Sequence, residues 1–209
     1  MSVRNIIFDV DGVLVSVNRA YFEYLRSFPQ YKDITFEDLP KICPISDFDG
    51  SFSLTQEFQS ALPLSFWKSE FLYKRPIFEG VPEVLRSLKA CGYRLFTMSA
   101  AFDPEGKGKW LRGLFGDLLM LGFSPPVQGK EQALRGLMVE YGMRPEETVF
   151  IDDRFSNIRA GLALGLHVVR MQPEFYLPLP PDLAVRVPVV RNMRELKDYV
   201  MGKRNKRGG

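Results

Sequence analysis

Short apolar runs alternate with amphipathic segments along most of the chain. The runs have the length of strands and are rich in β-branched and aromatic residues, as in Ile6-Ile7-Phe8. Between them, apolar residues recur at helical spacing, as Val84, Leu85 and Leu88 do ahead of Gly92. Because strands that alternate with helices are typical of a covered parallel sheet, we predict an α/β fold with a Rossmann-like parallel sheet and helices on both faces. The predicted strands are 5–10, 93–98, 148–151, 167–171 and 185–190, with a further apolar run at 118–123, and the predicted helices are 83–90, 131–141, 157–164 and 193–200.

Residues 16–76 break this alternation. Residues 19–28 and 54–62 show helical spacing, and residues 66–73 are rich in aromatic side chains, with few strand signals. A helical segment inserted directly after the first predicted strand either forms a cap over the sheet edge or only covers the core, and we favour the cap. The predicted organisation is an α/β core domain of residues 1–15 and 77–201, a small α-helical cap domain of residues 16–76, and a basic disordered tail of residues 202–209.

The composition is that of an ordinary soluble globular protein. The chain has 209 residues, of which 45% are hydrophobic and 25% charged. Its formal charge is +3, but the last eight residues carry four basic side chains. Without these four charges, the rest of the chain has a net charge of −1. A nearly neutral body argues against nucleic-acid binding. The four are Lys203, Arg204, Lys206 and Arg207.

Targeting and metal signals of the common kinds are missing from the sequence. No run of 18 apolar residues is present, so we expect no membrane span, and the first residues lack the pattern of a signal peptide. Cys43 and Cys91 do not have the spacing of metal ligands, and His167, the single histidine, lies in an apolar stretch. We expect reduced thiols, a packed histidine and a cytoplasmic protein.

Polar side chains follow three of the predicted strands. Asp9 and Asp11 come after the first strand, Ser99 after the second, and the pair Asp152 and Asp153 after the strand at 148–151. Parallel strands joined by right-handed crossovers have their carboxyl ends at one edge of the sheet, where ligands bind in open α/β folds. The sequence therefore predicts that these side chains converge.

The spacing of Asp9 and Asp11 favours acid–base chemistry. At i and i+2, their side chains share a face if the strand persists. Two carboxylates about 4 Å apart repel each other by roughly 4 kcal/mol at an effective dielectric constant near 20. One of them should then hold a proton, which would give a nucleophile beside an acid. We assign this proton to Asp11.

The second acidic pair favours a magnesium site. Asp152 and Asp153 offer the hard oxygen ligands that Mg²⁺ prefers. Lys130 opens a predicted helix, where it is either an exposed lysine or a cation aimed at an anion. Four aspartates, one proton, one Mg²⁺ and Lys130 sum to zero charge, so the site could accept a phosphate dianion. Ser99 would add a hydroxyl to a turn whose N–H groups also suit phosphate.

In chain order, these residues stand in the segments Asp9-Val10-Asp11-Gly12-Val13-Leu14, Ser99, Lys130 and Phe150-Ile151-Asp152-Asp153. The four segments resemble the four motifs of the haloacid dehalogenase (HAD) superfamily, in the right order. Residues 78–82 and 160–166 also resemble its phosphatase-like branch with a helical cap.

The resemblance implies a phosphoryl transfer in two steps. Asp9 would attack phosphorus and form an aspartyl phosphate, while Asp11 would first protonate the leaving oxygen and then activate water. Mg²⁺ would be held by Asp9, the Asp11 carbonyl and Asp153. Asp152 would either be a further ligand or contact one of the ligands. The residues expected to contact substrate are Ser99, Lys130, Gly12, Ala100 and Arg154.

Three positions depart from the family pattern. Asn157 stands where the family often has a further aspartate, and Ala100 follows Ser99 where asparagine is commoner. Arg154 replaces a small residue beside the acidic pair, and it could clamp a substrate anion or lie on the surface. Thr97 is an alternative to Ser99 for phosphate contact.

The reading favoured by these residues is a Mg²⁺-dependent phosphatase that acts on a small phosphorylated metabolite, as a monomer or a homodimer. Asp11 favours a phosphatase over a dehalogenase, because dehalogenases of this superfamily differ at that position. A phosphomutase is an alternative, with Lys68, Lys74 or Arg75 of the cap holding a second phosphate. A non-catalytic, phosphate-binding regulatory protein of the same fold is another, although mere binding has no use for a nucleophile beside an acid.

Overall fold

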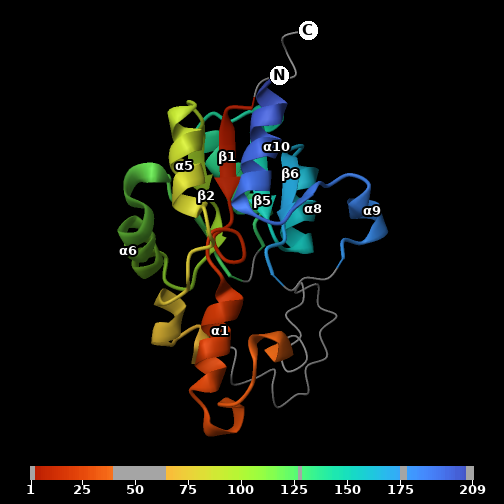
Figure 1. The fold of residues 1–209 in the computed structure, drawn as a ribbon. Coiled ribbons are helices and arrows are strands. Elements are labelled where there is room, and N and C mark those ends of the chain that lie inside the picture. The colour runs from red at the N-terminus through yellow and green to blue at the C-terminus, as the bar shows by residue number, and fades with distance from the viewer. Residues whose placement is uncertain (1–2, 40–64, 127–128, 175–177, 206–209) are drawn as a thin grey trace.

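The fold is built on a parallel sheet whose five strands run in the order β2-β1-β5-β6-β7 (Figure 1). The computed structural model describes residues 3–39, 65–126, 129–174 and 178–205. The α/β fold with a parallel sheet, predicted from the sequence, is confirmed. The strands are β1 (Asn5–Phe8), β2 (Arg94–Thr97), β5 (Thr148–Asp152), β6 (His167–Met171) and β7 (Val189–Val190).

The register of the central strands brings their carboxyl ends to one level. Phe8, the last residue of β1, lies opposite Thr97 on one side and Ile151 on the other. Just beyond it, the Asp9 N–H donates to the Ile151 carbonyl at 2.8 Å. Side chains that immediately follow β1, β2 and β5 are therefore brought to the same edge of the sheet.

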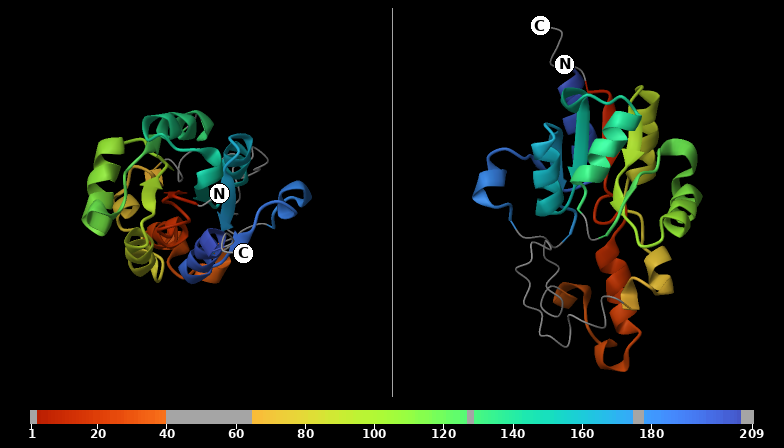
Figure 2. Two further views of the ribbon diagram at one scale, coloured as in Figure 1. Left: turned by 90° about the horizontal axis from the view of Figure 1, so that it is seen from above. Right: turned by 180° about the vertical axis from the view of Figure 1, so that it is seen from behind.

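Alternate residues of the strands serve two separate apolar cores. Ile6 and Phe8 pack with the helices on one face, and Ile7 packs with those on the other, as the two-residue repeat of a strand requires. The right-hand view of Figure 2, which shows the molecule from behind, has the helices of the second face in front of the sheet. The first face holds α5 (Val81–Ala90), α6 (Pro104–Phe115) and α10 (Met193–Asn205), and the second holds α7 (Glu131–Glu140) and α8 (Phe155–Ala163).

Helix α6 was not predicted, and it contributes to the site described below. Gly106 and Gly108 weaken its helical pattern in the sequence, because glycine is a poor helix former. The helix starts because the Asp103 side chain accepts the Gly106 N–H at 2.9 Å and Pro104 occupies the first turn. It lies between two short strands that pair with each other beside the main sheet, β3 (Ser99–Ala100) and β4 (Phe123–Ser124).

The predicted last strand is wrong over most of its length. Instead of a strand at 185–190, the chain forms α9 (Pro181–Ala184), continues the turn to Val187, and enters β7 only at Val189. Pro188 has no N–H to give to a sheet, and Val185 is 84% exposed, so the apolar run does not belong to a buried strand. The run at 118–123 is also mostly irregular, with one bridge from Met120 to Phe96 before β4.

The insertion after β1 extends beyond the carboxyl edge of the sheet (Figure 1). Its first helix was predicted at 19–28 and is α1 (Val17–Arg26); the predicted helix at 54–62, like Cys43, lies outside the described residues. Tyr24 and Phe66 form a small core of its own, so much of the aromatic run holds the insertion together. The domain boundaries stay a prediction, except that residues 202–205 of the predicted disordered tail form the end of α10. The insertion also contains three short 3-10 helices, η1 (Pro29–Tyr31), η2 (Phe36–Asp38) and η3 (Glu70–Tyr73).

The single histidine is packed at the start of a strand. His167 begins β6 and its Nε2 lies 3.1 Å from the Glu146 carbonyl, so it is packed against η5 (Pro145–Glu147) as predicted. Within the described parts of the chain, no helix is long and apolar enough to cross a membrane.

Gly161 of α8 tests how closely this helix packs on the sheet. A Cβ atom there would lie 2.7 Å from Phe150 and 2.9 Å from Val168. We expect Gly161→Ala to lower the free energy of unfolding by about 1–3 kcal/mol, the usual cost of overpacking. Gly136→Ala in α7 is the control, since it meets no atom within 4 Å and should stabilise by up to about 1 kcal/mol. Urea unfolding of both variants measures the difference, and equal effects would contradict the close packing.

Candidate active site

A tight turn after β1 separates the side chains of Asp9 and Asp11. The strand ends at Phe8, and the N–H groups of Leu14 and Val15 both donate to the Val10 carbonyl, at 2.9 and 3.0 Å. Gly12 has a φ of 80°, a left-handed conformation that glycine adopts without strain. The premise that a continuing strand puts both carboxylates on one face is therefore wrong, and the two have different partners.

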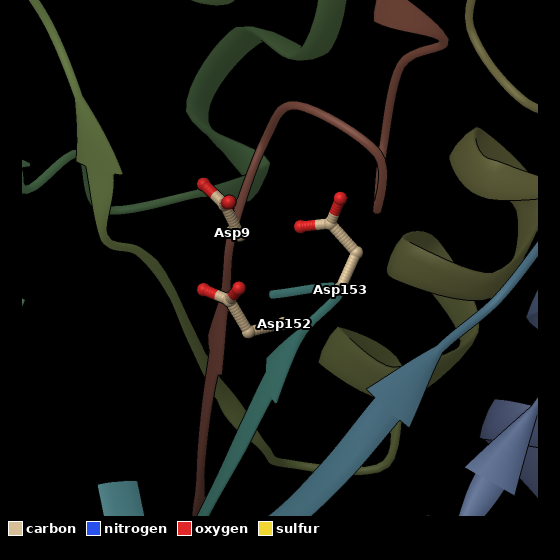
Figure 3. Close-up of side chains that lie close together, drawn as sticks. All are labelled: Asp9, Asp152 and Asp153. Atoms are coloured by element: carbon tan, nitrogen blue, oxygen red, sulfur yellow. The ribbon is translucent and has the colours of Figure 1, made fainter. Parts of the chain in front are cut away.

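Asp9 instead lies with the acidic pair at the end of β5, Asp152 and Asp153 (Figure 3). Carboxylate oxygens of Asp9, Asp152 and Asp153 lie within 4.8 Å of one another, and all three residues are buried. We call these three residues the aspartate triad. Three negative charges this close and this far from water need cations nearby.

Lys130 supplies one of these cations. It is the N-cap residue of α7, it is 3% exposed, and its Nζ lies 2.8 Å from Asp9 Oδ2 and 2.7 Å from Asp152 Oδ2. Burial by itself would lower the pKa of Lys130, but the carboxylates of Asp152 and Asp9 raise it above its ordinary value. The carboxylates of Asp9 and Asp152 thus explain why a lysine stands at this helix start, and the alternative that Lys130 is an exposed surface lysine is wrong.

Asp152 has a hydrogen-bond partner on both of its oxygens. Its Oδ2 accepts from Lys130, and its Oδ1 accepts from the Arg154 N–H at 2.9 Å and from the Asn157 amide at 3.1 Å. Asn157, the departure from the family pattern, is thereby used to hold Asp152. Asp152 is better placed to orient Lys130 and the loop after β5 than to offer a free oxygen.

Asp153 is the member of the triad with oxygen to spare. Its Oδ1 is buried and finds no hydrogen-bond partner among the described residues. Burial, Asp152 and Asp9 together raise the pKa of Asp153 well above its ordinary value. Burial also raises the pKa of Asp9, against the opposing charge of Lys130. An unpaired buried carboxylate oxygen facing other carboxylates fits a hard divalent cation such as Mg²⁺.

Two cations lie against Asp11 and favour its ionised form, so the prediction that it holds the shared proton is wrong. Its Oδ1 is paired with Arg75, and its Oδ2 lies 2.7 Å from the Nζ of Lys107. Burial alone would raise the pKa of Asp11, but the charges of Arg75 and Lys107 outweigh it and hold the pKa well below its ordinary value. The prediction failed because the sequence pattern did not show that two cations, Arg75 and Lys107, lie against this carboxylate.

Ser99 lies on the same side of the site as Asp11. The Lys107 Nζ is 2.9 Å from Ser99 Oγ and 2.9 Å from the Ala100 carbonyl, and Ser99 is fully buried. The hydroxyl of Thr97 interacts elsewhere, since it accepts the Gly122 N–H at 3.2 Å. Of the two hydroxyls considered from the sequence, that of Ser99 lies among the charged site residues.

Lys107 and Arg75 are the site residues that sequence reasoning missed or placed elsewhere. Lys107 could have been found only by recognising α6, which brings it beside Ser99. Arg75 was considered as a cap residue for a second phosphate, but its side chain is buried against Asp11 and Trp110, 4.2 Å from the ring centroid. The other two candidates for that role are exposed: Lys74 pairs with Glu70 at 2.7 Å, and Lys68 lies in the turn before η3.

Arg154 lies at the start of α8, beside the triad. It is half-buried, and its guanidinium is near enough to Asp153 to oppose the rise of that pKa. Arg154 is therefore neither a fully exposed surface residue nor a buried residue of the site, and its role as a clamp for a substrate anion stays a prediction. Arg170 of β6 is fully buried and donates from Nε to the Asp153 carbonyl at 3.3 Å, which fixes the same loop from behind.

Known structures share this fold over nearly the whole chain. A predicted phosphatase from Clostridium acetobutylicum has a TM-score of 0.70 at 18% identity, covering 97% of this chain and 100% of its own. A HAD family hydrolase from Deinococcus radiodurans, with bound phosphate and sodium, has a TM-score of 0.67 at 20% identity and covers 96% of each chain. YfnB from Bacillus subtilis, bound to magnesium, has a TM-score of 0.67 at 18% identity and covers 96% of this chain and 99% of its own.

The sequence itself gives a family assignment. No curated protein matches the chain. The sequence pattern of the haloacid dehalogenase-like hydrolases matches residues 3–165, a span that includes the triad, Ser99, Lys107 and Lys130. Since this span is well over half of the chain, the protein belongs to the haloacid dehalogenase-like hydrolases.

Proposed function

We propose that this hydrolase is a Mg²⁺-dependent phosphatase that cleaves a small phosphomonoester through an aspartyl phosphate on Asp9. The observation that carries the proposal is the pairing of Asp9 with Lys130 inside a buried aspartate triad that has an unpaired carboxylate oxygen. A phosphate dianion is compatible with such a site only where cations balance the carboxylates. The magnesium bound to YfnB and the phosphate bound to the Deinococcus protein support the same chemistry for this chain.

Asp9 is held as a nucleophile by hydrogen bonds to both oxygens. The Val10 N–H donates to Oδ1 at 2.6 Å, and Lys130 lies 2.8 Å from Oδ2. In the first step a carboxylate oxygen of Asp9 would bond to phosphorus, the bond from phosphorus to the ester oxygen would break, and that oxygen would take up a proton. Ser99 and Lys130 would donate to the phosphoryl oxygens.

Asp11 would move the protons. As a carboxylate paired with Arg75 and Lys107, it suits the second step, in which it takes a proton from the water that attacks the aspartyl phosphate. For the first step it must carry a proton to the leaving oxygen. It takes up that proton from solvent when its ion pairs with Arg75 and Lys107 loosen.

Asp9 and Asp153 would hold Mg²⁺, with Asp152 behind them and the Asp11 carbonyl as a further ligand. The bound ion would neutralise negative charge on the phosphoryl group and the triad. Substrate choice would come from the insertion, because the sheet residues contact only the phosphoryl group that all phosphomonoesters share.

Turnover of p-nitrophenyl phosphate tests the two catalytic assignments. Asp9→Asn should abolish phosphate release, since an amide cannot serve as this nucleophile. Asp11→Asn should lower the rate by about 10²–10⁴-fold, the usual size of an acid–base contribution. Asp117→Asn, at an exposed aspartate, is the matched control and should keep full activity. Near-normal turnover of Asp9→Asn would overturn the proposed mechanism.

Thermal unfolding tests the metal site without an activity assay. Mg²⁺ at about 100 times its Kd should stabilise the wild type by about 2.7 kcal/mol and raise Tm by several degrees, and excess chelator should reverse the shift. Asp153→Asn should lose this shift. Without metal it should melt no lower than the wild type, because it removes one of three buried like charges. A magnesium shift of the same size in Asp153→Asn would exclude Asp153 as a ligand.

A further inference from the structure

The insertion returns to the core across one face of helix α6. Asp103 and Trp110, seven residues apart, contact the returning segment: the Tyr73 hydroxyl lies 3.4 Å from Asp103 Oδ2, and the Tyr73 ring centroid 6.1 Å from that of Trp110. The Arg75 guanidinium lies over the Trp110 ring at 4.2 Å. Lys107 stands between Asp103 and Trp110 on the same helix. Residues 73–75 are thus docked on the helix that carries Lys107.

Lys107 is held by three acceptors. Its Nζ lies 2.7 Å from Asp11 Oδ2, 2.9 Å from Ser99 Oγ and 2.9 Å from the Ala100 carbonyl, and the residue is 5% exposed. A lysine ammonium has three N–H donors, so all of them are used. The ammonium therefore fixes Asp11 Oδ2 relative to Ser99 and the first residues after β2.

Arg75 holds the other oxygen of the same carboxylate. It pairs with Asp11 Oδ1, and its side chain is fully buried. The next residue, Pro76, accepts the Ser16 N–H at 2.8 Å, where the two connections of the insertion lie side by side. The two oxygens of Asp11 are thereby held by separate elements, one by α6 and one by the segment that returns from the insertion.

We propose that Lys107 and Arg75 are positioning residues that act through Asp11, each fixing one oxygen of the carboxylate that transfers protons in the proposed reaction. The proposal rests on the proposed function. Lys107 and Arg75 form no hydrogen bond or ion pair with the aspartate triad among the described residues, and the charge of Asp9 acts on Lys107 only as a minor influence beside Asp11. We therefore expect their main effect on the rate to come through where Asp11 is held. Lys107 also touches Ser99, and an effect on phosphate binding through Ser99 is the competing explanation.

A double-mutant cycle distinguishes the two explanations. Lys107→Met is made in the wild type and in Asp11→Asn, and phosphate release from p-nitrophenyl phosphate is measured for all four proteins. We expect Lys107→Met to lower kcat at least about 10-fold in the wild type, with KM changed less than about 3-fold. In the Asp11→Asn background the same substitution should change kcat less than about 3-fold, because the carboxylate it positions is gone. Arg75→Met should behave in the same way.

The control is Lys109→Met, the same substitution at an exposed lysine two residues along α6, which should leave kcat and KM unchanged. Where Lys107→Met does not unfold cooperatively, Lys107→Gln, which keeps an N–H for Ser99, takes its place. Equal losses of kcat in both backgrounds, or a loss confined to KM, overturn the positioning role while the wild type remains a phosphatase. A wild type without turnover, or an Asp9→Asn variant with full turnover, overturns the proposed function and this inference with it.

Discussion

The mutual repulsion of four carboxylates, three of them buried and that of Asp11 half-buried, is the constraint on which the rest of the site depends. Asp9, Asp11, Asp152 and Asp153 lie at or just beyond the ends of two neighbouring strands, and the parallel register of β1 and β5 brings these ends to one edge of the sheet. Their burial is possible because Lys130, Lys107 and Arg75 lie against them, also buried. Each cation comes from a different element, so the assembly of α7, α6 and the returning insertion around the sheet completes the charge balance.

The cations are divided unevenly, and the unevenness gives the site two parts. The aspartate triad is paired with Lys130, with Arg154 near Asp153, and it keeps a net negative charge, which suits a divalent cation. Asp11 has both Arg75 and Lys107, so that part is net positive and suits an anion. Ser99 contacts Lys107 and therefore lies in the positively charged part of the site, with Asp11.

The sequence was sufficient for residues that follow or precede a strongly patterned element. Asp9, Asp153 and Lys130 each adjoin such an element, so topology alone predicts that they meet. Partners that come from a distant or weakly patterned segment could not be found in this way. Lys107 is 96 residues from Asp11, on a helix diluted by glycines, and Arg75 is 64 residues away, at the end of the insertion. The ionisation of Asp11 was therefore predicted wrongly, because it is set by these partners and not by the spacing from Asp9.

Asn157 shows why a departure from a family pattern can leave the chemistry intact. Its amide donates to Asp152 Oδ1, which an ionised aspartate at that position could not do. A fourth carboxylate beside the triad would also add a negative charge that neither Lys130 nor a single divalent cation could balance. With asparagine, the three charges of the triad are offset by Lys130 and one such cation together. The substitution therefore keeps Asp152 in place and matches the charge of the triad to one metal ion.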